Sequence, residues 1–173
     1  MKRFIYSFVL SIGLCLIFAL SAAAQTSTFN DKNVEYTFDL PDAIWKMNLK
    51  PSAANPTVEY IYGYRSNAYL QIRKVSVKPD EPLSDAVKEM DEKLQFKPGY
   101  VAGAEENFAG NYRGKVANYE YIQSGRNMSG RIYFLRADDK TVYVLHFTGL
   151  RDQLRPLRNQ IDSIARTFKV NKT

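Results

Sequence analysis

Residues 103–148, GAEENFAGNYRGKVANYEYIQSGRNMSGRIYFLRADDKTVYVLHFT, decide the fold of this chain. Turn-forming residues divide this stretch at Gly110-Asn111, at 125–127 and at Asp138-Asp139. The runs between the turns are rich in Tyr, Val, Ile and Phe, and they predict four strands at about 103–108, 115–123, 129–136 and 141–148. Strands that follow one another through short turns form an antiparallel meander.

Further strands precede this meander. From Val34 to Leu40 apolar and polar residues alternate, which indicates a half-buried strand that Pro41 ends. Two more strands are predicted at about 58–64 and 69–77, and Trp45 is expected to cover one end of the core. Residues 25–32 are polar and are predicted to be a loose segment.

Two segments have helical periodicity. The first carries an apolar stripe at spacings of four, three and four, formed by Leu83, Val87, Met90 and Leu94. The second closes the domain with a stripe formed by Leu154, Leu157, Ile161, Ile164 and Phe168, and Pro156 is expected in its first turn. We therefore predict an α+β fold in which two amphipathic helices pack on an antiparallel meander.

The N-terminus reads as a signal peptide. Lys2 and Arg3 precede an apolar run from Phe4 to Leu20, and Ala22-Ala23-Ala24 offers a cleavage site after Ala24. An uncleaved membrane anchor is the alternative, but the run is slightly short for a span. We predict a signal peptide at 1–24, a single domain at 33–170, and a periplasmic or extracellular protein without a stable transmembrane anchor.

Cysteine and charge narrow the chemistry further. Cys15 is the only cysteine and lies in the leader, so the mature domain has neither disulfide nor thiolate. Removal of Lys2 and Arg3 leaves 22 basic and 18 acidic residues, a net charge of 22 − 18 = +4. No run of Lys and Arg exceeds two residues. We therefore expect a protein or envelope component as the partner and no nucleic acid.

Few residues are suited to catalysis. His146 is the only histidine, and no Gly-x-Ser-x-Gly motif accompanies it. The adjacent acids Glu105 and Glu106 would point to opposite faces of a strand. We predict no catalytic site, no cofactor and no metal site. A hydrolase that uses His146 with a carboxylate stays open as an alternative, and it requires an acid beside His146 in a cleft.

Tyrosines are the unusual feature of the composition. The chain has 12 of them, and five fall in two alternating sets: Tyr60, Tyr62 and Tyr64 on one predicted strand, Tyr119 and Tyr121 on another. One interpretation is an aromatic surface that binds a ligand or partner. The other is structural, since tyrosine suits a half-buried sheet.

The residues also carry a family resemblance. The segment 33–41, NVEYTFDLP, with Trp45 after it, the segment 108–114, FAGNYRG, and the hairpin 138–145, DDKTVYVL, resemble PsbP-like and DcrB-like domains. The resemblance covers roughly 33–170 and includes the closing helix. It implies an exported antiparallel sheet between helices that acts as a non-catalytic accessory protein. The alternative is a carrier of a small apolar ligand, which predicts a pocket with an aromatic and aliphatic lining.

Overall fold

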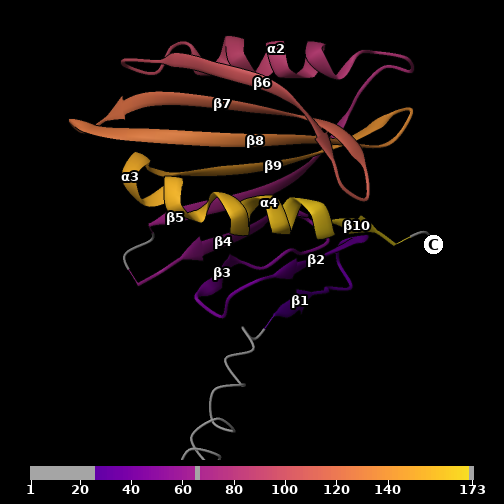
Figure 1. Ribbon diagram of the computed structural model, residues 1–173. Helices are drawn as coiled ribbons and strands as arrows, with labels where there is room; N and C mark the ends of the chain where they lie inside the picture. Colours follow the sequence, from indigo (N-terminus) through magenta and orange to yellow (C-terminus); the bar gives the residue numbers. More distant parts are fainter. Residues whose placement is uncertain (1–25, 65–66, 172–173) are drawn as a thin grey trace, which may run out of the picture.

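The computed structural model of the chain describes residues 26–64 and 67–171 (Figure 1). The predicted signal peptide and its cleavage after Ala24 lie outside these residues. Among the residues described, no helix is long and apolar enough to cross a membrane.

The larger of two sheets has seven antiparallel strands. In sheet order the neighbours are β3-β4-β5-β9-β8-β7-β6. The bounds are β3 (Trp45–Leu49), β4 (Val58–Tyr62), β5 (Ala68–Ser76), β6 (Val101–Ala109), β7 (Arg113–Gln123), β8 (Arg126–Asp138) and β9 (Thr141–Leu150). Strands β6 to β9 are the predicted meander, so this prediction and the α+β class are confirmed.

A smaller sheet was not foreseen. It consists of β1 (Ser27–Phe29), β2 (Tyr36–Leu40) and β10 (Lys169–Val170), with β2 in the centre. The sequence predicted only β2 among these three. The segment expected to be loose therefore contains β1, and Trp45, expected beyond any strand, begins β3. Strands this short have too little pattern to be recognised, because pairing with a distant neighbour defines them.

The helices lie where their apolar stripes indicated, with one correction. Helix α2 (Leu83–Leu94) covers the predicted apolar stripe from Leu83 to Leu94. The closing helix was expected as one piece with Pro156 in its first turn. It begins earlier and divides into α3 (Arg151–Leu154), a 3₁₀ turn η1 (Arg155–Leu157) and α4 (Arg158–Thr167). Pro156 lies in η1, because proline lacks the N–H that a continuous helix would need there.

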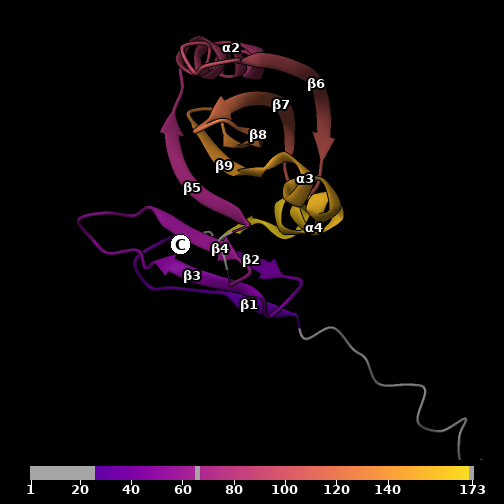
Figure 2. The same cartoon turned by 90° about the vertical axis from the view of Figure 1, so that its left-hand side faces the viewer.

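The two faces of the large sheet are covered differently (Figure 2). Helix α2 packs over β7 and β8 on one face. The other face packs against α4 and the small sheet, around a core that includes Phe38, Phe147 and Phe168. The strands curve so that the segment from β6 to β9 bends toward α3 and α4 (Figure 2). This curvature positions the site described next.

Candidate functional site

A cleft of about 760 Å³ opens between the helices at the C-terminal end of the domain and the curved part of the sheet. Its sheet wall comes from β6, β7 and β8, and its helical wall from α3, η1 and α4. The lining residues that the argument uses are Val101, Arg131, Arg151, Leu154, Arg155 and Arg158. A cavity of this volume is in the range of small-molecule sites, roughly 300–1,000 Å³.

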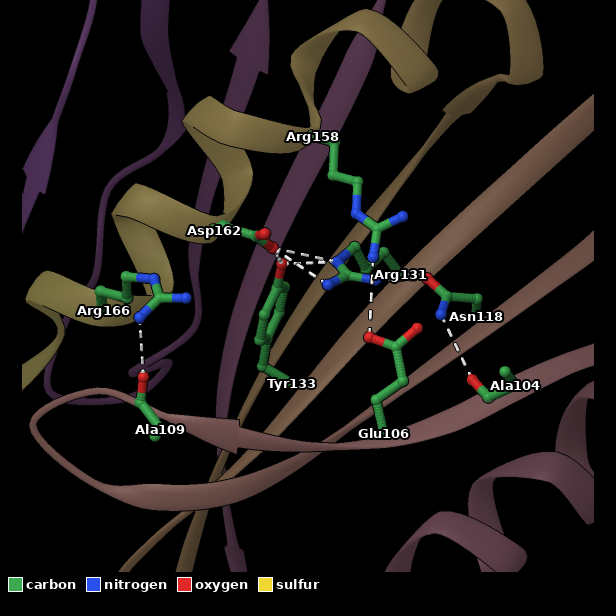
Figure 3. A network of polar contacts seen from close by, with 9 residues as sticks. All are labelled: Ala104, Glu106, Ala109, Asn118, Arg131, Tyr133, Arg158, Asp162 and Arg166. Carbon is green, nitrogen blue, oxygen red and sulfur yellow. Dashed lines mark hydrogen bonds and ion pairs between the residues drawn. The ribbon is translucent and has the colours of Figure 1, made fainter.

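Arg131 of β8 lies at the floor of the cleft with only 7% of its surface exposed. Its Nε donates a hydrogen bond to the Tyr133 hydroxyl at 2.6 Å, and its Nη2 lies 3.1 Å from Asp162 Oδ1 in α4 (Figure 3). The Tyr133 hydroxyl also donates to the same carboxylate. Burial alone would lower the pKa of Arg131, but Tyr133 and Asp162 outweigh it and raise the pKa. A buried charge is tolerated only with such partners, so this network joins α4 to the sheet.

The strand register explains why Arg131 reaches this position. Asn118 of β7 is its direct cross-strand neighbour, so both side chains project from the same face. Arg131 Nη1 donates to Asn118 Oδ1 at 2.7 Å, and Asn118 Nδ2 donates to the Ala104 carbonyl at 3.2 Å. Ala104 lies where the register of β6 shifts, between Ala102 and Glu105. The irregularity in β6 is thus held by the same network that fixes Arg131 (Figure 3).

Three arginines form the helical wall. Arg151, Arg155 and Arg158 follow one another at spacings of four and three, which places them on one side of the helical segment. Arg158 Nη2 lies 3.6 Å from Glu106 Oε2, and Arg151 Nη1 lies 3.5 Å from Glu120 Oε2. In the ranges 26–64 and 67–171, Arg155 has no ion pair, and none of the three side chains donates a hydrogen bond to a protein acceptor.

These ion pairs are weak. The side chains of Arg151 and Arg158 are 43% and 57% exposed, and the pairs exceed the 2.7–2.9 Å typical of charge-assisted hydrogen bonds. Exposed pairs of this kind contribute about 0–1 kcal/mol. The three guanidinium groups therefore keep most of their donors available to an incoming ligand.

The predicted tyrosines do not form one surface. Tyr60 is 5% exposed in the core against Phe29 and Phe38, at ring distances of 6.1 and 5.7 Å. Tyr62 is partly buried, with its ring 5.0 Å from that of Trp45. Tyr64 follows β4 in a turn and is fully exposed.

The other two tyrosines lie on the opposite face of the sheet, under α2. Tyr119 and Tyr121 stack at 5.8 Å and are 3% and 7% exposed. Only Tyr119 adjoins the cleft. A binding role for the five tyrosines stays a prediction, and among them Tyr64 has the exposure that direct contact with a partner needs.

His146 lies on the α2 face as well. The Tyr119 hydroxyl and His146 Nε2 are 2.7 Å apart. Burial, followed by the charges of Arg73 and Lys97, lowers the pKa of His146 to about 4, so the ring is neutral at pH 7. No carboxylate among the residues described hydrogen-bonds this ring. The acid that the hydrolase interpretation requires is therefore not beside His146 in the part of the chain described.

The sequence analysis did not single out Arg131, the buried cation at the floor of the cleft. Alternation along β8 offers a signal, because Arg131 shares a face with the buried Tyr133 and Leu135. A cation at an inward-facing position indicates a buried partner.

The described ranges contain no cluster suited to a metal ion, since no three His, Cys, Asp or Glu residues gather at one point there.

Comparison with known proteins gives the fold. No family model matches the chain, and no curated protein matches its sequence. Among solved structures, LpqN of Mycobacterium tuberculosis, involved in cell envelope biogenesis, is 15% identical with a TM-score of 0.56, over 86% of this chain and 92% of LpqN. The cyanobacterial PsbP of Synechocystis is 12% identical with a TM-score of 0.56, over 88% of this chain and 95% of that one.

A third neighbour comes from a eukaryote. The Ran-binding protein Mog1p of Saccharomyces cerevisiae is 9% identical with a TM-score of 0.60, over 85% of this chain and 96% of Mog1p. At such identities the likeness concerns the fold alone. The chain has a PsbP-like fold, as the resemblance in its sequence implied.

Proposed function

We propose that this chain is an exported, non-catalytic binding protein that holds a ligand in the cleft between β6–β8 and α3–α4. The observation that carries the proposal is the helical wall, where three arginine side chains line a cavity of about 760 Å³ without donating a side-chain hydrogen bond to any described residue. A cavity with a few convergent polar groups is the usual form of a ligand site.

Two other observations support parts of this proposal. Export is supported by the leader at 1–24 and by the envelope role stated for LpqN. A non-catalytic role is supported by the hydrogen bond between His146 and Tyr119, with no carboxylate partner among the residues described, and by the Ran-binding function stated for Mog1p. Each of these supports a class of protein rather than a particular ligand.

We propose binding of a protein or envelope component as the second candidate function. It is favoured by large apolar side chains exposed around the turn after β4: Tyr64 is fully exposed and Ile44 is 44% exposed. The Gly63 amide donates to the Ile44 carbonyl, which brings the two segments together. The Ran-binding activity stated for Mog1p shows that this fold can serve protein recognition.

Native mass spectrometry on the mature protein, purified gently from its own host, tests both candidates. Extra mass of a few hundred daltons supports a ligand in the cleft, and a co-purifying protein supports the second candidate. A mature mass that starts at Gln25 and carries nothing shows cleavage but contradicts stable ligand binding.

Matched variants locate the ligand. Val101→Trp fills the mouth of the cleft, where Val101 is 61% exposed, and should abolish the extra mass. Ile44→Trp adds the same ring at a position that does not line the cleft, and it should leave the mass unchanged. Loss of the ligand in Ile44→Trp but not in Val101→Trp would move the site to the turn after β4.

A further inference from the structure

The wall opposite the arginines shows that a ligand meets apolar surface as well as charge. Val101 of β6 pairs with Glu120 of β7, and Ile122 follows two residues later, so the three side chains share the cleft side of the sheet. Val101 is 61% exposed and Ile122 is 43% exposed. The Ile122 amide donates to the Pro98 carbonyl at 2.7 Å, which fixes this apolar surface at the start of β6.

The arginines lie at different positions along the cleft. Arg151 lies at the end near Val101, through its pair with Glu120, and Arg158 lies toward the other end, through its pair with Glu106. Arg155 lies between them, and among the residues described it has no anionic partner. Arg131 at the floor is saturated by Asp162, so its charge is not available to a ligand. The free donors therefore concentrate at Arg155 and Arg158, away from the exposed aliphatic side chains.

We propose that the ligand is a single anionic amphiphile, an acyl or alkyl chain that ends in a phosphate or carboxylate head. This inference rests on the proposed function. The head accepts hydrogen bonds from Arg155 and Arg158, since planar guanidinium groups match the oxygens of such anions. The acyl or alkyl chain leaves the cleft along Leu154 and Val101, toward Ile122, which lies beyond the lining on the same side of the sheet.

Each half of this ligand explains a feature that the other half does not. A purely apolar ligand would cover Arg155, which has no anionic partner among the residues described, and would offer its guanidinium group no acceptor, which is costly. A small inorganic anion would leave Val101 and Ile122 exposed and most of the volume empty. The acids at the cleft do not exclude an anion, because Glu106, Glu120 and Asp152 make only long, exposed pairs with the arginines.

Binding of dodecyl phosphate to the mature protein, measured by isothermal titration calorimetry below the micelle concentration, tests this inference. Inorganic phosphate serves as the head alone and dodecyl maltoside as an uncharged chain. We expect dodecyl phosphate to bind about tenfold or more tightly than either half. Arg155→Gln should weaken dodecyl phosphate binding about tenfold, since hydrogen bonds to a charged group contribute on that scale.

The control variant is Arg73→Gln, which removes the same charge from an exposed position on the opposite face of the sheet. It should bind dodecyl phosphate as the unchanged protein does. Thermal melting of both variants checks folding, which an exposed substitution should leave intact.

The outcomes separate the two proposals. Equal affinity for dodecyl maltoside would overturn the anionic head and leave the ligand-binding function standing. If inorganic phosphate binds as tightly as dodecyl phosphate, the alkyl part contributes nothing to binding, and the proposal of an amphiphile is wrong. Binding to vesicles of phosphatidylcholine and phosphatidylglycerol without binding to monomeric dodecyl phosphate would assign the surface to a membrane and overturn a single-molecule ligand. No binding of any probe, together with a bare mature mass from the host, would overturn the proposed function itself.

Discussion

The two faces of the seven-stranded sheet are built on different principles. The α4 face is closed by a helix and a second sheet, with a dense aromatic core and one buried charge network. The α2 face carries one helix over β7 and β8, and its core is a smaller cluster around Tyr119 and Val144. The first face buries the larger core, so we expect it to contribute more to the stability of the fold than the second. The cleft lies at the margin of the stronger face, where a rigid wall can position a ligand.

Removal of a buried side chain from each core should show this difference most clearly. Phe168 is fully buried, with its ring 5.1 Å from that of Tyr36 and 5.0 Å from that of Tyr143. Phe168→Ala should lower the free energy of unfolding by about 3–5 kcal/mol. Val87→Ala in α2 removes two methyl groups and should cost about 1.5 kcal/mol. Urea denaturation measures both, and equal losses would contradict the comparison.

The buried network should give the next largest effect. Asp162→Ala leaves the charge of Arg131 buried without its main partner, which should cost about 3 kcal/mol. The double variant Arg131→Met with Asp162→Leu removes both charges and should recover most of that loss. The same urea experiment tests this pair. If the double variant is as unstable as Asp162→Ala, packing rather than the unpaired charge is responsible.

The contribution of the α2 face to the free energy of unfolding should depend on pH. His146 has a pKa of about 4 in the folded chain, below the ordinary value of 6.5. The folded state binds fewer protons than the unfolded state between these values, so the free energy of unfolding should fall as pH is lowered from 6.5 toward 4. The slope is at most about 1.4 kcal/mol per pH unit.

A variant isolates this contribution. His146→Gln keeps a polar group opposite Tyr119 and has no proton to gain. Between pH 7 and pH 5 its stability should change less than that of the unchanged protein. Parallel curves for the two proteins would assign the acid sensitivity to other groups.

The smallest effect should come from the rim of the cleft. Arg158→Gln breaks a long, exposed pair with Glu106 and should change stability by less than about 1 kcal/mol. Thermal melting is sufficient to measure it. A loss as large as that of Asp162→Ala would mean that Arg158 holds α4 in place and is not available to a ligand.

Periodicity predicted the parts of the fold that depend on local pattern. The apolar stripe of α2 and the turn residues around β7, β8 and β9 are recognisable from local sequence alone. The positions predicted for these elements agree with the structure to within a few residues. Strands β1 and β3 could not be found in the same way, because β1 has only three residues and β3 does not alternate between buried and exposed side chains. Pro156 was noted, but the start of α3 at Arg151 placed it in the middle of the closing segment.

The site was less predictable than the fold, because it depends on which face of the sheet packs against the helices. Alternation correctly grouped Tyr119 with Tyr121, but it could not place them on the face opposite Tyr60. Arg131 and Asp162 are 31 positions apart on different elements, and only the curvature of the sheet brings them together. The spacing of Arg151, Arg155 and Arg158 places them on one side of a helical segment, but only the structure shows that this side lines a cleft.

The pairing of β10 with β2 has a consequence for how the domain assembles. Val170 pairs with Tyr36, which is 170 − 36 = 134 positions earlier, and the small sheet has β2 as its centre (Figure 1). A chain that emerges from N- to C-terminus, from a ribosome or a translocation pore, exposes β2 long before its outer neighbour exists. Because so distant a contact must wait for nearly the whole domain, final closure is a late event. Until then one edge of β2 lacks its neighbouring strand. Its unpaired backbone groups can pair with other chains unless a chaperone covers them.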